Sequence, residues 1–153
     1  MGIYDGLDDK IKKHNDEKNN EAKENKEKEK ALSELKSKMK PLVVEGIDGF
    51  VEMAIKVGIS PGKVKKDLFF IPEIMPVKIW WIHPKYVITR NRKIYSYVRS
   101  VQRVSKKSLI NDIIEHIIKS NEMDYSYRKA SDIRNWDYEN AVKKYFQERL
   151  GIL

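Results

Sequence analysis

The pattern of apolar and polar positions divides the chain into two parts. Residues 8–40 form a low-complexity stretch in which acidic and basic side chains alternate, and from residue 16 to residue 30 the only apolar side chain is Ala22. Such a segment cannot bury surface, so it predicts either disorder or a solvated helix supported by Glu–Lys pairs three and four residues apart. We therefore interpret residues 1–40 as a charged arm, a marginal helix or disordered, and residues 41–153 as a single globular domain.

Apolar residues in the second part recur with the spacing of amphipathic helices in three places. One predicted helix ends near Gly58, a second begins after a cap at Ser105 or Ser108, and a third begins at Asp137 and ends at Gly151. The positions expected to face the core are Ile47, Phe50, Val51, Ala54 and Ile55 in the first helix, Leu109, Ile110, Ile113, Ile114, Ile117 and Ile118 in the second, and Val142, Tyr145, Phe146 and Leu150 in the third.

Three short segments rich in β-branched and aromatic residues predict strands at Val77–Ile82, Tyr86–Thr89 and Ile94–Val98. A turn at residues 83–85 and a hairpin turn at residues 90–93 separate them. The polar stretch from Ser120 to Asn135 is expected to be irregular, with one helical turn after Ser131. The expected fold class is therefore α+β: a small antiparallel sheet of about three strands, with helices packed on one face and a charged arm in front.

The length of the second hairpin loop decides which side chains share a face of the sheet. A two-residue loop at Asn91-Arg92 pairs Ile88 with Tyr95 and Tyr86 with Tyr97. One face would then carry Tyr86, Ile88, Arg90, Lys93, Tyr95, Tyr97 and Arg99. A loop one residue longer or shorter exchanges the two faces, so the composition of this surface depends entirely on the turn.

The formal net charge of +8 is concentrated in this region, because no acidic residue occurs between Glu73 and Asp112. Cations displace counterions from phosphates, and flat rings stack on bases, so this combination is typical of a nucleic-acid surface. The candidate nucleic-acid-binding residues are Lys85, Tyr86, Arg90, Arg92, Lys93, Tyr95, Tyr97, Arg99, Arg103, Lys106 and Lys107. The hypothesis is a non-catalytic nucleic-acid-binding protein, with DNA or RNA as its partner and the choice between them open.

Other interpretations of the same residues stay open. Facing tyrosines stabilise a sheet without any ligand, and charges at hairpin tips prevent edge-to-edge aggregation. The alternative function is a protein–protein interaction, assembly or inhibitor module whose basic face binds an acidic partner protein. A third is attachment to a membrane surface through the apolar positions Ile3, Tyr4, Leu7 and Ile11. The oligomeric state is not determined by the sequence.

The composition argues against several kinds of chemistry. The chain has no cysteine, which excludes disulfides, thiolate catalysis and sulfur-ligated zinc. His14, His83 and His116 share no metal-ligand spacing, and the segment around Gly58 lacks the spacing of a phosphate-binding loop. We therefore expect no metal, no cofactor and no enzymatic activity. No apolar run is long enough to span a bilayer and the first residues do not resemble a signal peptide, so a cytoplasmic location is expected.

The hairpin formed by Tyr86–Thr89 and Lys93–Ser96 resembles short DNA-contacting hairpins found beside homing endonuclease domains. The resemblance covers only this hairpin, and Arg92 stands where those turns have a glycine. It implies DNA contact by the hairpin. No nuclease motif accompanies it, and no site residue is carried over from it.

Overall fold

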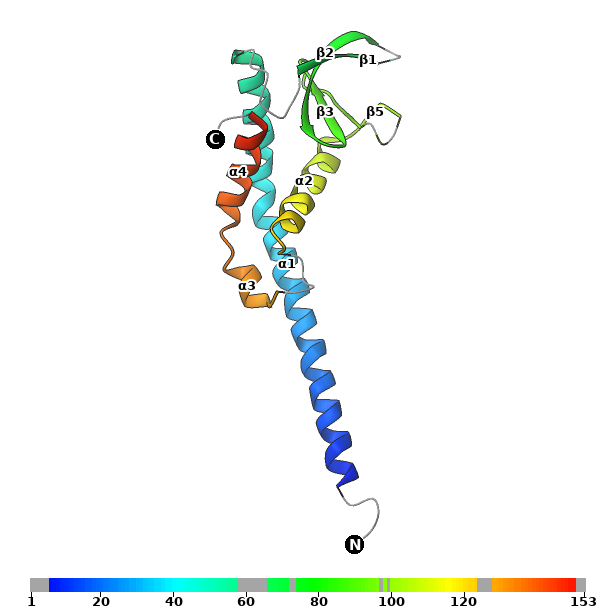
Figure 1. Cartoon of the computed structure of the whole chain (residues 1–153), viewed down its shortest axis with the longest axis vertical. Helices are drawn as coiled ribbons and strands as arrows, with labels where there is room; N and C mark the ends of the chain where they lie inside the picture. Colours follow the sequence, from blue (N-terminus) through cyan, green and yellow to red (C-terminus); the bar gives the residue numbers. More distant parts are fainter. Residues whose placement is uncertain are drawn as a thin grey trace. The chain divides into compact units, whose positions relative to one another are not determined.

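The structure, a computed structural model, describes residues 6–57, 66–71, 74–96, 98, 100–123 and 128–150. This part of the chain contains helices and antiparallel strands, and the α+β class predicted from the sequence is confirmed (Figure 1). In chain order the elements are α1 (Leu7–Val57), β1 (Lys66–Ile71), β2 (Ile74–His83), β3 (Tyr86–Thr89), β4 (Ile94–Ser96), β5 (Gln102–Arg103), α2 (Lys106–Ser120), α3 (Ala130–Arg134) and α4 (Tyr138–Leu150).

The chain forms two compact units, and the long helix α1 contributes to both. The first unit comprises Met1–Leu35 and Glu122–Trp136, and the second comprises Lys36–Asn121 and Asp137–Leu153. The charged stretch before residue 40 is helical, and α1 continues through Pro41 without ending there.

In the first unit, the charged part of α1 packs against the single helical turn α3, which begins at Ala130 where the sequence predicts a short turn. The Ala130 backbone N–H donates to Glu24 Oε1 at 3.2 Å. Arg134 Nη2 donates to Glu27 Oε2 at 2.8 Å, and this hydrogen bond lowers the pKa of Glu27. The small apolar core of the unit includes Ala31 of α1 and Ile133 of α3, both of which are buried.

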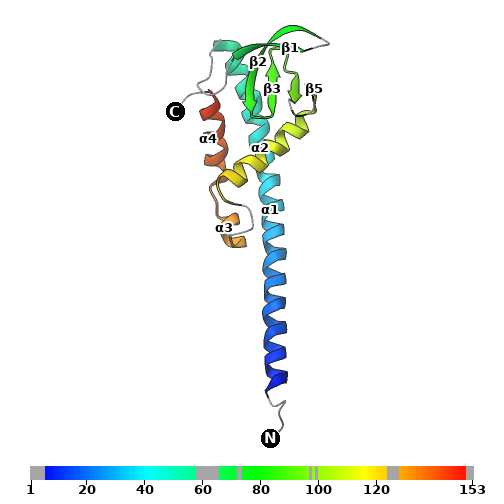
Figure 2. The same ribbon diagram turned by 45° about the vertical axis from the view of Figure 1, so that its right-hand side comes forward.

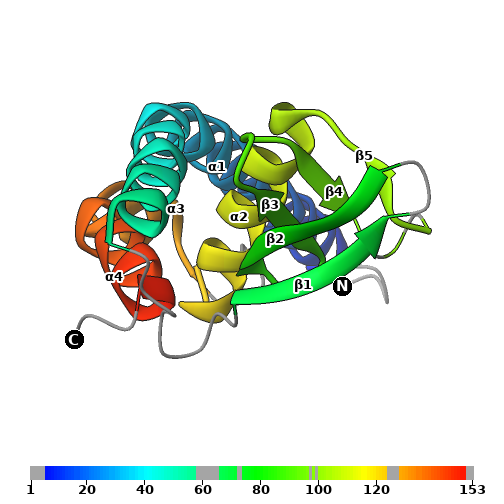
Figure 3. The same ribbon diagram turned by 90° about the horizontal axis from the view of Figure 1, so that it is seen from above.

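In the second unit, the described strands form one antiparallel sheet in the order β1-β2-β3-β4-β5, so each strand pairs with its neighbours in sequence. The prediction of about three strands is too low, because β1 and β5 extend the sheet at its two edges. Helix α2 runs along one face of the sheet toward α4 (Figures 2 and 3). The hydroxyl of Tyr86 on β3 donates to Asp112 on α2, which identifies the face that the helix covers.

The three predicted helix faces contribute to the core of this unit, together with buried side chains of the sheet. The six predicted core positions of α2 are all buried, and its cap is Ser105, whose side chain accepts a hydrogen bond from the Ser108 N–H. Helix α4 buries Val142, Tyr145 and Phe146, as the periodicity predicts. Leu150 of α4 is only partly buried, and Ile55 of α1 is exposed, so these two core predictions are wrong. Helices α1 and α4 are in contact, because a Cβ atom added at Gly46 would overlap the Phe146 ring.

The predicted register of the β3–β4 hairpin is wrong by one residue. The observed pairs are Tyr86–Ser96, Val87–Tyr95 and Ile88–Ile94. The loop therefore contains three residues, and it closes through hydrogen bonds from Arg92 N to Thr89 O and from Thr89 N to Lys93 O, each 2.9 Å long. Arg92 has a φ of 64°, the left-handed conformation that a glycine usually supplies at this position of a three-residue loop.

The shift moves the side chains of β4 to the opposite face of the sheet relative to those of β3. Tyr86 lies on the side of α2, and Tyr95 lies on the opposite side, in a cluster with Ile79 and Val87 against which Trp81 packs. The predicted surface that combined tyrosines and cations on one face therefore does not exist in this form. Tyr97 and Arg99, which belonged to it, lie outside the described residues.

Candidate nucleic-acid interface

The two described tyrosines among the candidate site residues are buried. Tyr86 is 5% exposed and Tyr95 is 4% exposed. Tyr86 is held under α2 by its hydrogen bond to Asp112, and the Tyr95 ring contributes to the apolar cluster on the far face of the sheet. The expectation that these two rings stack on bases is therefore wrong, because either ring would have to leave its packing to reach a base.

Four of the candidate cations converge on one surface depression. Arg92, Lys93, Arg103 and Lys106 line a shallow hollow of about 490 Å³, which we call the basic hollow. They come from the hairpin loop, from β5 and from the first turn of α2. Ile94, Val104 and Ser105 complete its lining. Cations that are separate in the sequence thus share one concave site.

Strand pairing explains why these side chains meet. Strand β5 returns antiparallel to β4 with Tyr95 opposite Arg103, and the Val104 N–H donates to Ile94 O at 2.9 Å. This pairing brings Arg103 next to the hairpin loop that carries Lys93. Ser105 caps α2 directly afterwards, so the helix begins at the same place and Lys106 points from its first turn.

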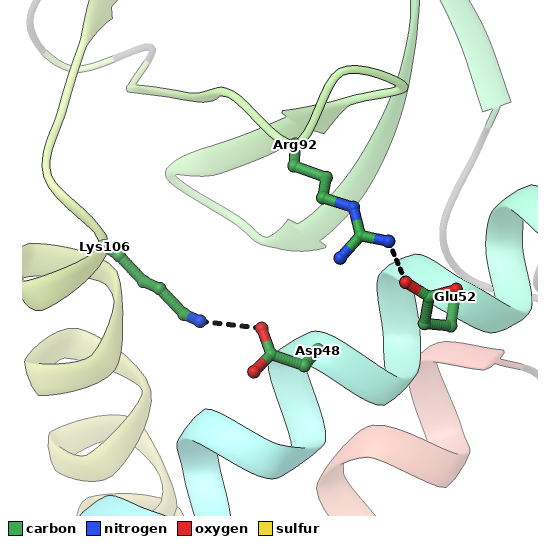
Figure 4. Close-up of polar contacts among 4 residues, drawn as sticks. All are labelled: Asp48, Glu52, Arg92 and Lys106. Atoms are coloured by element: carbon green, nitrogen blue, oxygen red, sulfur yellow. Dashed lines mark hydrogen bonds and ion pairs between the residues drawn. The ribbon is translucent and has the colours of Figure 1, made fainter.

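Two carboxylates of α1 are paired with cations of the basic hollow (Figure 4). Lys106 Nζ lies 2.7 Å from Asp48 Oδ1, and Arg92 forms an ion pair with Glu52. Asp48 and Glu52 are four residues apart on one helix, where like charges repel by a few tenths of a kcal/mol, roughly, and the two cations offset this repulsion. Lys93 and Arg103 have no acidic partner among the described residues.

The remaining candidate cations lie near the hollow or at a distance from it. Arg90 is exposed in the hairpin loop, and Lys107 is exposed beside Lys106 in the first turn of α2. That turn contains no acidic residue, so nothing on it opposes the attraction of the helix dipole for an anion. Lys85 is exposed in the β2–β3 turn, at the other end of β3, and is not part of this site.

No motif or spacing in the sequence connects His83 with His116, but the structure brings the two rings together. Their ring centroids are 5.6 Å apart, and the Tyr145 ring lies 5.7 Å from His116. Burial, together with the neighbouring His116, lowers the pKa of His83 to about 4. The Lys85 N–H donates to His83 Nδ1 at 3.2 Å, which places the proton of the neutral ring on Nε2.

Two structural features are absent from the described ranges. No group of three or more His, Cys, Asp or Glu side chains gathers there as a metal site would require. Likewise, none of the helices described combines the length and apolar character of a membrane span. Comparisons of this chain with protein-family models, with curated proteins and with solved structures found no match.

Proposed function

We propose that this chain is a non-catalytic nucleic-acid-binding protein that holds the phosphate backbone on the basic hollow. The observation that carries the proposal is the convergence of Arg92, Lys93, Arg103 and Lys106 on one concave surface. Lys93 and Arg103 have no internal acidic partner within the described chain, so their charges are available to a ligand. A polyanion that places phosphates there releases condensed counterions, which is the main source of sequence-independent affinity.

The burial of Tyr86 and Tyr95 determines the expected mode of binding. Without these rings for stacking, recognition at the hollow is by phosphate contacts, which position a nucleic acid but read no sequence. Each phosphate contact contributes about −0.9 to the slope of log K against log salt for duplex DNA, and about −0.7 for a single strand. Four cations therefore limit the slope contributed by the hollow to about −4.

The test is a fluorescence anisotropy titration of labelled single-stranded RNA, single-stranded DNA and duplex DNA at several salt concentrations. The variant Lys93→Gln with Arg103→Gln removes the two cations that have no internal partner. We expect it to weaken binding and to reduce the salt slope by about two units. The control variant Lys119→Gln with Lys143→Gln removes the same charge from exposed positions elsewhere on α2 and α4. Salt-independent binding, or equal losses in both variants, would refute the proposal.

A second candidate function is binding of an acidic protein segment, and the contacts of the hollow favour it specifically. Both ion pairs of its cations are made with carboxylates on a helix, Asp48 and Glu52, so two of these cations already pair with the groups that an acidic helix would present. A competition experiment distinguishes the two candidate functions: a bound, labelled oligonucleotide is displaced either by unlabelled oligonucleotide or by poly-glutamate of equal total charge. Displacement by poly-glutamate at a lower charge concentration than by unlabelled oligonucleotide would favour the acidic protein partner.

A further inference from the structure

A second concave surface lies between α2 and α4, at the opposite end of α2 from the basic hollow. It encloses about 350 Å³. His116 and Ser120 of α2 line one side, and Lys144, Glu148 and Arg149 of α4 line the other. Its volume is within the range of about 300–1,000 Å³ that is typical of small-molecule sites. Polar groups of α2 thus face charged groups of both signs on α4 across a site of ligand size.

Arg149 is held in a single orientation at this cleft. Its Nε donates to Ile82 O at 2.8 Å, and its Nη1 donates to Tyr145 O at 3.3 Å. The guanidinium carbon also lies 3.5 Å from the centroid of the Tyr145 ring. No hydrogen bond from Nη2 occurs within the described part of the chain. A restrained cation with a free N–H edge is ready for a ligand, because its side-chain entropy has already been lost on folding.

The other charged groups of the cleft form no ion pair among the described residues. Lys144 and Glu148 are one helical turn apart on α4, yet they form no ion pair with each other or with another described residue. His116 makes ring contacts but no hydrogen bond among the described residues. Burial and Arg149 lower the pKa of His116, so the ring is neutral near neutral pH. Two cations against one carboxylate leave the cleft with an excess positive charge.

We infer that the cleft between α2 and α4 binds a small molecule through an oxyanion group, a carboxylate or a phosphate, held by Lys144 and Arg149. Charge-assisted hydrogen bonds from an ammonium and a fixed guanidinium are the standard means of holding such a group. The apolar lining from Ile117 and Ala141 offers a surface for the rest of the ligand. His116 lies at the wall of the cleft, where its neutral ring can donate or accept one hydrogen bond. This inference does not rest on the nucleic-acid function.

The experiment follows the ring Hε1 signals of the histidines in the full chain by proton NMR at fixed pH. Inorganic phosphate in one series, and acetate in another, replaces chloride at constant ionic strength. We expect a saturable shift of the His116 signal with at least one of the two anions. His14, which is exposed on the charged part of α1, is an internal control and should not saturate. Saturation by only one anion identifies the oxyanion class that the cleft accepts.

Matched variants make the result specific to the cleft. Lys144→Gln should weaken the response of His116 by about tenfold, since it removes one charge-assisted hydrogen bond. Lys143→Gln removes the same charge from the adjacent exposed position of α4, outside the cleft, and should leave the response unchanged. The variant Lys93→Gln with Arg103→Gln, which tests the basic hollow, should also leave it unchanged. A linear response to both anions, or equal losses in the Lys143 and Lys144 variants, would overturn the inference.

Discussion

The ammonium nitrogen of Lys106, in the first turn of α2, lies 2.7 Å from the carboxylate of Asp48 on α1. One helical turn further along α1, Glu52 forms the equivalent ion pair with Arg92 of the hairpin loop (Figure 4). Both pairs are about half-exposed to solvent. Two cations of the basic hollow are therefore paired with carboxylates of α1 that a bound polyanion has to replace, and the affinity of the hollow depends on the free energy of opening these pairs.

The first prediction concerns these two carboxylates. The variant Asp48→Asn with Glu52→Gln frees Arg92 and Lys106, so oligonucleotide affinity in the anisotropy titration should rise by about tenfold, since each exposed pair is worth up to about 1 kcal/mol. The control Glu45→Gln with Glu115→Gln removes the same charge from exposed positions outside the hollow. Equal gains in the two variants would show that only the net charge matters and that the ion pairs do not.

The second prediction concerns the backbone of Arg92, whose φ of 64° is unfavourable for a residue with a Cβ atom. Arg92→Ala and Arg92→Gly both lose the ion pair with Glu52, but only the glycine removes the backbone strain. We expect the glycine variant to be about 1 kcal/mol more stable than the alanine variant in urea denaturation. Equal stability would mean that the loop accommodates a side chain at this position without strain.

The third prediction uses two glycines on the same helix. A methyl group at Gly46 would overlap the Phe146 ring: the ring Cζ atom would lie 2.8 Å from it, and two other ring atoms would lie closer. At Gly49, by contrast, no atom lies within 4 Å of the corresponding position. Gly46→Ala should therefore destabilise the protein by about 1–3 kcal/mol through overpacking. Gly49→Ala should stabilise it by about 0.5–1 kcal/mol, because alanine is the better helix former. Thermal or urea denaturation gives both values, and effects of the same sign would contradict this packing.

The fourth prediction concerns pH. The pKa of His83 falls from 6.5 to about 4 in the folded protein, through burial first and then the neighbouring His116, with Arg149 and Lys85 contributing and Asp112 opposing. Between these two values the unfolded chain binds a proton that the folded chain does not bind. The free energy of unfolding should therefore fall as the pH is lowered from about 6.5 to about 4, by at most about 1.4 kcal/mol per pH unit for one proton.

Urea denaturation at a series of pH values measures this slope. His83→Asn retains an acceptor for the Lys85 N–H but does not titrate, so its profile should be flatter than that of the wild type. The pKa of His116 is lowered as well, so a smaller slope of the same sign should remain in the variant. A slope that does not change in His83→Asn would contradict the assignment of this proton to His83.

The helices were predictable because their signals are local. The apolar face of α2 recurs over 15 residues, and the cap at Ser105 supplies an independent start signal. The structure adds β1 at one edge of the sheet and β5, which has two residues, at the other. Neither was predicted as a strand. Strand β5 is too short to carry a pattern, and β1, which has six residues, is defined as a strand by its pairing with β2.

The candidate site was predictable only in part, because it depends on backbone conformation and tertiary contacts. The cations of the hollow were identified from their charge alone. The side chains that share a face of the hairpin were not identified correctly, because the loop has three residues instead of two, with Arg92 at a positive φ. Helix packing brings His83 next to His116 and pairs Lys106 with Asp48. No sequence motif predicts either contact.

The order of the strands has a consequence for how the protein is made. Each of the described strands pairs with its sequence neighbours, so this sheet can assemble from short-range contacts, which form rapidly. By contrast, Val43, Ile47 and Phe50 of α1 are buried in the finished molecule, and Phe146 packs against the same helix at Gly46. During synthesis this part of α1 leaves the ribosome long before α4 does. We expect the growing chain to expose an apolar helix stripe in this interval, which makes it a substrate for chaperones until α4 arrives.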